Sequence, residues 1–312
     1  MRIGIDAMGG DYAPKNNVLG AIEARKQLLS GSRIVLFGNK EEIVAICKDV
    51  GFEHTEFDIV NTSQVIEMSD HPAKAFSQKS DSSITVGFAA LQSGEINGFA
   101  SAGNTGAMLV GAMTTVKPIP GILRPCISSL FPLVNGGDAI ILDVGLNADA
   151  RPEILYQYGI LGSVFAKYVM NEESPRVALL NIGEEEEKGN LLTKAAYELM
   201  KDSKDFNFVG NIEGHEIFSG KKADVVICDG FVGNIILKQA ESFYGIAKKL
   251  EINHEYFDRF NYEVQGGTPV LGVNSTIIIG HGASSPTAIK NMILQTERVI
   301  QVDLVSKIKE AL

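Results

Sequence analysis

The sequence lacks the long apolar segments and the cysteine clusters that mark membrane-spanning and disulfide-bonded proteins. It has no run of about 18 apolar residues, so no transmembrane helix is expected. The three cysteines, Cys47, Cys126 and Cys228, form neither a CxxC pair nor a zinc-ligand spacing, which is typical of a reducing compartment. The first residues, Met1–Asp6, have the pattern of a strand and not of a signal peptide. We therefore expect a cytoplasmic protein.

Basic residues are fewer than acidic ones. The chain of 312 residues has 28 Lys and Arg against 38 Asp and Glu, which gives a net charge of −10. This balance argues against general nucleic-acid binding. With 45% hydrophobic and 21% charged residues, the composition is that of an ordinary globular protein, and the length fits one large domain or two intertwined halves.

Several well-known catalytic and nucleotide-binding motifs are incomplete. The stretch from Gly214 to Lys222 is one residue too long for a Walker A loop and has lysine where Ser or Thr is required. In Gly280–Ser285, serine stands at the last glycine of GxGxxG. His215 and His254 each lack the second histidine of HExxH, and no GxSxG elbow is present. These gaps argue against the nucleotide-binding, metalloprotease and serine-hydrolase classes that the motifs mark.

Short apolar runs alternate with amphipathic segments, which predicts an α/β fold. The proline-rich stretch from Pro118 to Pro125 predicts a loop or crossover between two halves. The apolar stripe of 152–171 fits packing on a sheet or a dimer seam. Strands are expected at 2–6, 33–37, 57–60, 98–101, 127–133, 139–143, 176–181, 207–210, 223–228 and 276–280, and helices at 16–30, 41–50, 72–78, 83–93, 105–116, 152–171, 188–201, 234–250 and 286–312.

The predicted strands end in loops of Gly, Asp, Asn, Ser and Thr. In open α/β sheets such loops line the ligand crevice, so together they predict a shared polar cleft. Asp6, Asp11, Asp143 and Asp229 could form a carboxylate site for a divalent metal, although each residue is more often a cap. The loops concerned are 6–11, 101–106, 143–147, 181–184, 228–230 and 280–285.

The stretch 223–249 has the pattern of a strand, a glycine loop and a helix that begins near Gly233 and Asn234. A helix start leaves backbone N–H groups at the positive end of the dipole, which favours an anion. Asp229, Asn234 and Lys238 could act on that anion. The alternative is an ordinary turn in which glycine supplies the geometry and asparagine the cap.

Four glutamates, Glu184–Glu187, come directly before Lys188. Such a run commonly begins a solvated helix, because acidic side chains complement the helix dipole. Lys188 follows a predicted strand end, however, and a lysine there could neutralise a phosphate or a developing oxyanion.

Taken together, these motifs resemble those of the bacterial phosphate acyltransferases, the acyl-ACP:phosphate transacylases or PlsX family. The departures are Leu146, where the family's DVGAN motif has alanine, and the pair Ser275-Thr276, where it has a small residue and proline. Leu146 is larger than alanine and could narrow the cleft, which would change the acyl-chain preference. The matching stretches are IGIDAMGGDYAP (3–14), SAGNTGAM (101–108), GILRPCI (121–127), LDVGLNAD (142–149), LLNIGEEEEKGN (179–190), VVICDGFVGNIILK (225–238) and GTPVLGVNSTIIIGHGASSPTAIKN (267–291).

The resemblance implies a fold similar to isocitrate and isopropylmalate dehydrogenases and to phosphotransacetylases. This is a three-layer α/β/α domain over 1–312 with a mixed sheet, two intertwined halves and a protruding aromatic segment around 245–265. It implies reversible transfer of a fatty acyl group from acyl carrier protein to inorganic phosphate, giving acyl phosphate for phospholipid synthesis. It also implies a homodimer without cofactor or metal, peripheral on the inner face of the plasma membrane, and working with glycerol-3-phosphate acyltransferase.

The same resemblance, together with the loop pattern, predicts the site residues. Lys188 and Asn234 are the predicted catalytic pair: Lys188 offsets charge on phosphate or the oxyanion, and Asn234 donates a hydrogen bond. The residues predicted to bind substrate or to orient this pair are Asp6, Gly9, Gly10, Asp11, Asn104, Thr105, Asp143, Asn147, Gly183, Asp229, Gly230, Gly233, Lys238, His281 and Gly282.

Several alternatives stay open at this point. Cys228 is either a buried thiol or an acyl-enzyme nucleophile. The aromatics of 256–262 fit a dimer contact, a helical hairpin or a membrane contact. The rival functions are acyl transfer from coenzyme A, a dehydrogenase of the same fold, and a non-catalytic scaffold. An acidic carrier protein requires a local basic patch, for which the candidates are Lys221/Lys222, Lys248/Lys249 with Arg259, and Lys307/Lys309.

Overall fold

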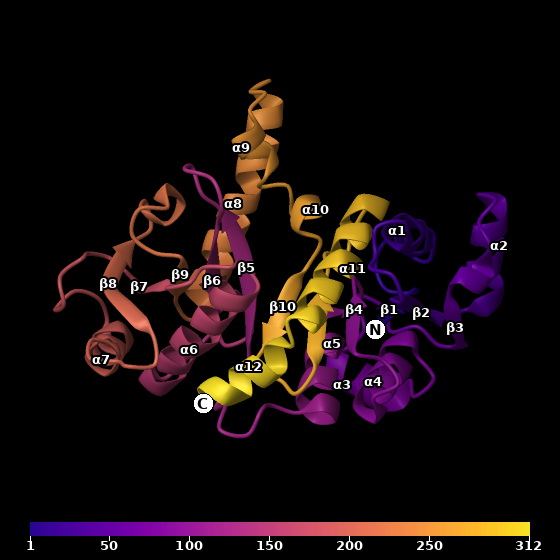
Figure 1. Ribbon diagram of the computed structural model, residues 1–312, viewed down its shortest axis with the longest axis horizontal. Coiled ribbons are helices and arrows are strands. Elements are labelled where there is room, and N and C mark those ends of the chain that lie inside the picture. The colour runs from indigo at the N-terminus through magenta and orange to yellow at the C-terminus, as the bar shows by residue number, and fades with distance from the viewer. The chain divides into compact units, whose positions relative to one another are not determined.

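The computed structural model describes residues 1–312, which form two compact units (Figure 1). Each unit is built from two stretches of chain: Met1–Pro118 with Tyr262–Gln301, and Ile119–Asn261 with Val302–Leu312. We call them unit 1 and unit 2. The first passage between them follows Pro118, in the proline-rich stretch where the sequence predicts a crossover.

The strands of unit 1 run parallel except β10, which is antiparallel to its neighbour β11. β10 was not predicted, because Pro269 within it lacks the N–H that a strand donates. In spatial order the strands are β3 (Asp58–Asn61), β2 (Arg33–Gly38), β1 (Arg2–Asp6), β4 (Gly98–Ser101), β11 (Thr276–Ile279) and β10 (Thr268–Leu271).

Helices cover both faces of this sheet (Figure 1). The predicted helix 105–116 continues past α5 as a π-helical turn over Ala112–Val116. The predicted helix 286–312 is broken, because Asp303 takes a left-handed conformation with φ 50°. One face carries α1 (Lys15–Arg25), α2 (Lys40–Asp49) and α11 (Pro286–Gln301), and the other α3 (Pro72–Gln78), α4 (Ser83–Ser93) and α5 (Thr105–Gly111).

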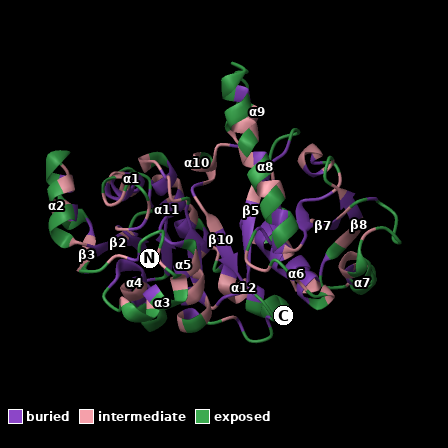
Figure 2. Ribbon diagram, turned by 180° about the vertical axis from the view of Figure 1, so that it is seen from behind, coloured by how far each residue is buried: buried purple, intermediate pink, exposed green.

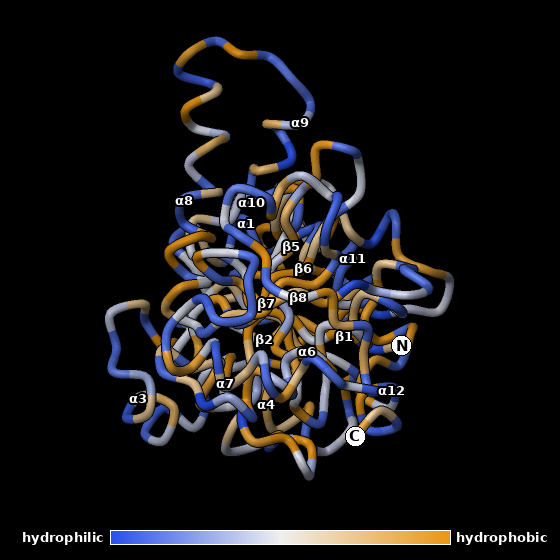
Figure 3. Tube along the Cα trace, turned by 90° about the vertical axis from the view of Figure 1, so that its left-hand side faces the viewer, coloured by the Kyte–Doolittle hydropathy of each residue, from blue (hydrophilic) through white to orange (hydrophobic).

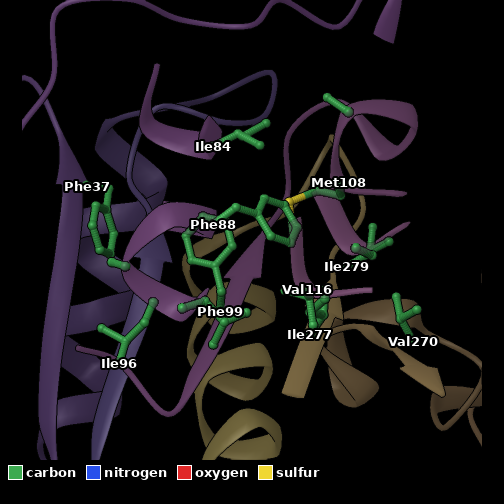
Figure 4. Packing of buried hydrophobic residues seen from close by; sticks show 14 of the residues in the cluster. Phe37, Ile84, Phe88, Ile96, Phe99, Met108, Val116, Val270, Ile277 and Ile279 are labelled. Atoms are coloured by element: carbon green, nitrogen blue, oxygen red, sulfur yellow. The ribbon is translucent and has the colours of Figure 1, made fainter. Parts of the chain in front are cut away.

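The core on the α4 side of unit 1 is built around aromatic rings (Figure 4). Phe88 of α4 and Phe99 of β4 pack edge to face with ring centroids 5.3 Å apart, and Phe37 of β2 lies 5.8 Å from Phe99. This arrangement suits the ring quadrupoles. A methyl group at Gly87 would overlap the Phe99 ring, so glycine lets α4 approach the sheet. The core fixes β1 and β4, whose ends carry predicted site residues.

The strands of unit 2 are also mixed in direction: β5 is antiparallel to β6, and the other strands are parallel. α6, α7 and α12 cover one face and α8 the other (Figure 1). In spatial order the strands are β5 (Cys126–Pro132), β6 (Asp138–Leu142), β9 (Val225–Ile227), β7 (Arg176–Asn181) and β8 (Asn207–Glu213), and the helices are α6 (Pro152–Tyr168), α7 (Leu191–Met200), α8 (Gly230–Lys249) and α12 (Leu304–Ala311). Both units therefore confirm the predicted α/β fold with a mixed sheet.

The apolar stripe of α6 packs within unit 2. Ile154, Tyr158, Leu161 and Phe165 are all buried, and α6 lies on β6, β9 and β7. A methyl group at Gly162 would overlap Val225 of β9. Packing on the sheet therefore explains the stripe, and most of it is not available for a dimer seam.

The segment after α8 is partly helical, with α9 (Glu255–Asp258) in unit 2 and α10 (Tyr262–Gln265) in unit 1. Phe260 is 6% exposed and packs edge to face with Phe243 and Phe218. Phe260 is therefore part of an aromatic cluster and does not itself make a membrane contact, which was one of the alternatives for these aromatics. Figure 3 shows polar and apolar residues interspersed along α8 and α9. None of the helices is long and apolar enough to cross a bilayer.

Candidate functional site

The two predicted catalytic residues follow neighbouring strands of unit 2. β6, β9 and β7 are adjacent and parallel, so their carboxyl ends meet at one edge of the sheet. Lys188 lies in the loop after β7, and Asn234 lies near the start of α8, which follows β9. The loop 143–147 after β6 begins at the same edge. In open α/β sheets this is the edge at which ligands bind.

Asp143 is fully buried and organises the loop after β6. Its Oδ1 accepts hydrogen bonds from the backbone N–H groups of Ile127, Gly145 and Leu146. Its Oδ2 accepts from the backbone N–H of Asn147 at 2.6 Å and from Asn147 Nδ2 at 3.0 Å. These donors use the lone pairs of the carboxylate. The structure thus assigns Asp143 to loop organisation and not to direct substrate contact.

Asn147 connects this loop to two other elements. Its Nδ2 lies 2.8 Å from the carbonyl oxygen of Pro125 and 2.8 Å from the hydroxyl of Tyr158. Its backbone carbonyl accepts the N–H of Gly230, the first residue of α8, at 2.8 Å. Asn147 is therefore engaged by the protein, like Asp143, and it holds the start of α8 against the loop after β6.

At the start of α8, most of the backbone N–H groups that were predicted to be free for an anion have partners within the protein. The helix begins at Gly230 and not near Asn234, because the Asp229 side chain caps it and accepts the N–H of Val232 at 2.9 Å. The N–H of Gly230 donates to Asn147 and that of Gly233 to the Asp229 carbonyl. Only the N–H of Phe231 has no such partner in this turn. Side chains, and not a row of backbone amides, must therefore supply the charge for an anion.

Two glycines let α8 lie directly against the loop after β6. A methyl group at Gly230 would stand 2.9 Å from the backbone nitrogen of Asn147. A methyl group at Gly233 would overlap the carbonyl oxygen of Asp143 and stand 2.9 Å from Cys228 Sγ. These glycines thus have a packing role, which fixes where Asn234 is placed, and their contact with substrate stays a prediction.

Asn234 is exposed and only partly engaged. Its Nδ2 donates one hydrogen bond, 3.1 Å long, to the carbonyl oxygen of Val144. An amide group has two N–H donors, so the second N–H and Oδ1 are available to a ligand. Lys238, one turn further along α8, forms an ion pair with Glu241 at 2.8 Å. Of the two α8 side chains predicted to act on an anion, Asn234 has no acidic partner, whereas the charge of Lys238 is paired with Glu241.

Lys188 lies in a loop and not in the first turn of a helix. The sequence predicts a helix that starts at Lys188. The helix found there, α7, begins at Leu191, because Asn190 caps it and accepts the N–H of Thr193. The stem of Lys188 packs over Gly183, where a methyl group would stand 2.8 Å from Lys188 Cγ. Gly183 therefore leaves the space that the lysine side chain occupies.

The Lys188 ammonium is not neutralised by the glutamates before it. No ion pair of unit 2 includes Lys188. Glu184 pairs with Lys222 at 2.7 Å instead. Since Lys188 is exposed, its positive charge is available to an anion at the strand edge.

In unit 1, Asp6 has the role that Asp143 has in unit 2. It is 1% exposed, and its carboxylate accepts hydrogen bonds from Ser101 Oγ at 2.6 Å and the N–H of Met8 at 3.0 Å. Burial raises the pKa of the Asp6 carboxyl, while these hydrogen bonds act to lower it. Asp6 therefore organises the loop after β1 and is not exposed to a substrate.

The loops after β1, β4 and β11 lie together within unit 1. The N–H of Asp11 donates to the carbonyl oxygen of Gly282 at 2.8 Å. A methyl group at Gly9 would stand 2.7 Å from the backbone nitrogen of Gly103. Gly10 has φ 108°, a conformation that side chains other than hydrogen rarely allow. These loops thus form the unit 1 group of predicted site residues.

Asn104 and His281 are engaged within unit 1. The Asn104 amide donates to the carbonyl oxygens of Glu67 at 3.0 Å and Asp70 at 3.1 Å, and its Oδ1 caps α5. His281 Nδ1 accepts the N–H of Ala283, and its ring lies 4.7 Å from that of Tyr262. Thr105, the first residue of α5, is exposed. Of these predicted substrate contacts, Asn104 has its amide fully used by the protein.

Two residues that support these loops were not predicted. Asn17, 3% exposed in α1, donates its amide hydrogens to the carbonyl oxygens of Asp6 and Gly9. Tyr158, fully buried in α6, holds Asn147. Each of them is a polar group on the buried face of a helix. Because a buried amide or hydroxyl requires a hydrogen-bond partner, this pattern could have indicated that they hold a nearby loop.

Cys228 is a buried thiol at the end of β9 and not a nucleophile. It is 4% exposed, and its Sγ lies 3.6 Å from the carbonyl oxygen of Asp143. Burial raises the pKa of the thiol well above its usual value, and the Asp229 and Asp143 carboxylates raise it further. A thiol in this environment does not form the reactive thiolate.

The four aspartates considered as an alternative metal site are divided between the units. Asp6 and Asp11 belong to unit 1, and Asp143 and Asp229 to unit 2. Three of the four carboxylates accept backbone N–H groups of their own loops. The structure has no group of three or more His, Cys, Asp or Glu residues that could hold a metal ion.

Most of the lysines and arginines predicted to dock an acidic carrier have acidic partners. The exceptions are Lys221, Lys249 and Lys309, which form no ion pair. The ion pairs are Lys222 with Glu184 and Glu216, Lys248 with Asp258, Arg259 with Asp138, and Lys307 with Glu310.

Comparison with known proteins identifies relatives along the whole chain. The family model described as "Fatty acid synthesis protein" matches residues 1–254. The phosphate acyltransferase of Dictyoglomus thermophilum is 42% identical, with 100% of this chain and 98% of that protein covered. The phosphate acyltransferase of Dictyoglomus turgidum is 41% identical, with the same coverage of both chains, 100% and 98%.

Among solved structures, the fold is similar to that of a phosphotransacetylase from Streptococcus pyogenes. The TM-score is 0.66 at 16% identity, and the match covers 96% of this chain and 94% of the other. At this identity the likeness concerns the fold, and it agrees with the phosphotransacetylase-like architecture expected from the sequence.

Proposed function

The chain belongs to the phosphate acyltransferase family, and from this premise we propose that it transfers a fatty acyl group reversibly from acyl carrier protein to inorganic phosphate. The acyl phosphate product would supply glycerol-3-phosphate acylation in phospholipid synthesis. The observation that carries the proposal is the pair Lys188 and Asn234: an ammonium without an ion pair and a carboxamide with a spare N–H follow neighbouring parallel strands.

In the proposed reaction, a phosphate oxygen attacks the thioester carbonyl carbon directly. The C–O bond forms, so that the carbonyl carbon becomes tetrahedral and its oxygen an oxyanion. The oxyanion then re-forms the C=O bond as the C–S bond breaks, which gives acyl phosphate and releases the carrier thiolate. The ordinary pKa of such a thiol is about 8.5, so it leaves without a strong acid. No serine or cysteine nucleophile is required, which fits the buried Cys228 and the absence of a serine elbow.

Lys188 and Asn234 supply the electrostatics of this step. Lys188 offsets the charge of phosphate and of the oxyanion that develops from the thioester carbonyl. Asn234 donates its second N–H to one of these oxygens, while its first N–H, bonded to Val144, fixes the orientation of the amide. The packing at Gly183 and Gly233 sets the positions of the two side chains before substrate binds.

The carrier protein would dock beside the loop that carries Lys188. Lys222 contacts Glu184 in that loop, and Lys221 is next to it in sequence and has no acidic partner. A lysine in this position can attract an acidic carrier and direct the thioester toward the strand edge.

The direct test of the proposed reaction is phosphate-dependent release of free thiol from acyl carrier protein. We expect turnover that requires phosphate, faster with the acyl carrier than with acyl coenzyme A at equal concentration. The KM for the carrier is expected to rise with salt, because docking is electrostatic. Faster turnover with acyl coenzyme A would instead favour a phosphotransacetylase-like function, and no phosphate-dependent release with either donor would rule out the proposal.

We further propose that the chain forms a homodimer and contacts the inner face of the plasma membrane, near the glycerol-3-phosphate acyltransferase that consumes its product. The supporting observation is the distal end of α8, where Ile246 is 51% exposed, followed beyond the helix by Leu250 at 65% and Ile252 at 43% (Figure 2). Isolated apolar residues are common on surfaces, but several in succession at a helix end indicate a contact.

Replacing Leu250 and Ile252 by aspartate is expected to abolish one of these two contacts while the fold is retained. Light scattering measures the dimer, and sedimentation with anionic liposomes measures membrane binding. A matched control is Lys249→Asp, which changes a neighbouring exposed residue without removing apolar surface. If both the mass and the sedimented fraction of the double variant equal those of the wild type, distal α8 has neither role.

A further inference from the structure

Asn211 in β8 is a buried polar residue that the reaction outlined above does not use. It is 1% exposed. Its Nδ2 donates a 2.9 Å hydrogen bond to the carbonyl oxygen of Glu185, in the loop after β7. The same carbonyl accepts the backbone N–H of Lys188 at 3.1 Å. Asn211 and Lys188 thus share one acceptor.

A β-bulge gives Asn211 this orientation. Between Val177 and Leu179 the β7–β8 pairing shifts, so that Phe208 pairs with Val177 but Asn211 pairs with Leu179. β8 therefore contains an extra residue, and Gly210 has φ 90°. A methyl group at Gly210 would meet nothing within 4 Å, so the glycine serves the backbone conformation and not close packing. Bulges of this kind redirect the side chains that follow them and are frequent beside active sites.

Stability alone does not account for an asparagine at position 211. Its Oδ1 is buried and has no hydrogen-bond partner. A buried acceptor without a partner destabilises the folded state, and an apolar side chain would avoid this cost. The hydrogen bond to Glu185 must therefore serve something other than the packing of β8.

The other anchors of the Lys188 loop are nearer to solvent. Asn181 donates to the carbonyl oxygen of Lys188 at 3.2 Å, and Lys222 pairs with Glu184 on the surface. Water competes with exposed hydrogen bonds and ion pairs, whereas the hydrogen bond from Asn211 is partly shielded because its donor side chain is buried. Asn211 is thus the buried anchor of the turn from Glu185 to Lys188.

We propose that Asn211 is a positioning residue, which holds the Glu185 carbonyl and so fixes where the Lys188 ammonium lies. The inference rests on the proposed function of Lys188. Asn211 touches no reacting atom. It determines how often the lysine occupies the position from which it can stabilise the oxyanion.

The test variant is Asn211→Ala, which removes the donor and the unpaired acceptor together. We expect kcat to fall between tenfold and a hundredfold, as for a group displaced by about 1 Å. The KM for the carrier should change much less, because Asn211 does not line its docking surface. Circular dichroism and thermal melting establish that the variant is folded.

A destabilised neighbour is the matched control. Ile212 is adjacent to Asn211 in β8 and is 1% exposed. The substitution Ile212→Val removes one buried methylene, which lowers the stability of the fold without changing a contact to the Lys188 loop. We expect its kcat to stay within twofold of the wild type. An equal fall in kcat for Ile212→Val and Asn211→Ala would mean that both act through general stability, and it would overturn the proposal.

A double-mutant cycle separates positioning from an independent effect. In the Lys188→Ala background, Asn211→Ala is expected to change kcat less than twofold, because no ammonium remains to be positioned. A loss as large as in the wild type would overturn the inference. If Lys188→Ala keeps full activity, both this inference and the role of Lys188 fail. If Lys188→Ala is inactive while Asn211→Ala is unchanged, only this inference fails.

Discussion

Alanine at Lys188 or at Asn234 is expected to lower kcat by about 10²–10³ each, the usual effect of removing one stabilising group from an oxyanion site. Lys188 has no acidic partner and Asn234 has a spare N–H, so both can interact with reactants without first breaking an internal bond. Both side chains are exposed, so thermal stability should change little. Thiol release from acyl carrier protein measures the rate, and thermal melting checks the fold.

The control for the lysine is Lys194→Ala. Lys194 is also exposed and lies in α7, just beyond the same loop, but its side chain forms no ion pair. This variant is expected to keep the wild-type rate. If Lys188→Ala and Asn234→Ala each keep more than a tenth of wild-type turnover while folded, the catalytic assignment is wrong.

Alanine at Gly233 is expected to destabilise unit 2 by about 3 kcal/mol and to abolish most activity. The added methyl group would overlap the carbonyl oxygen of Asp143, and backbone on both sides cannot yield without moving α8 or the loop after β6. Either shift displaces Asn234, the next residue. Since the chain has no tryptophan, urea unfolding is best followed by circular dichroism.

Gly245→Ala in the same helix is the matched control. A methyl group at Gly245 would meet nothing within 4 Å, so the substitution should stabilise α8 by up to about 1 kcal/mol through helix propensity. The same substitution, glycine to alanine, is thus expected to lower the stability at position 233 and to raise it at position 245. Equal effects at both positions would show that α8 does not lie against the loop after β6 as the structure indicates.

The fold could be predicted well where local sequence determines it. β1, β4 and β7 have the predicted bounds, because buried parallel strands are short apolar runs that end at a polar residue. β10 could not be predicted in this way. It pairs with β11 across a turn, and its proline conceals the strand pattern. The break between α11 and α12 was also missed, because Asp303 carries no clear signal for a left-handed conformation.

The positions of the site residues could be predicted, but most of their contacts could not. Asp143, Asn147 and Asn104 were predicted to bind substrate or to orient the catalytic pair, and the structure engages them with backbone groups. The bonds to Ile127, Pro125 and Glu67 join residues 16 to 37 positions apart, so no local pattern indicates them. For the same reason the sequence did not reveal Asn211, whose role depends on a bulge and on a carbonyl in another loop.

The division of each unit into two stretches of chain affects how the protein folds during synthesis. β4 pairs with β11 in unit 1, and the chain between them includes all of 119–261, which belongs to unit 2. During translation, β4 therefore leaves the ribosome with one edge unpaired, because its partner strand β11 is translated much later. Unpaired edges of this kind attract other chains, and pairing over such a separation is slow. In a nascent chain of this protein, that edge therefore stays unpaired until β11 has been translated.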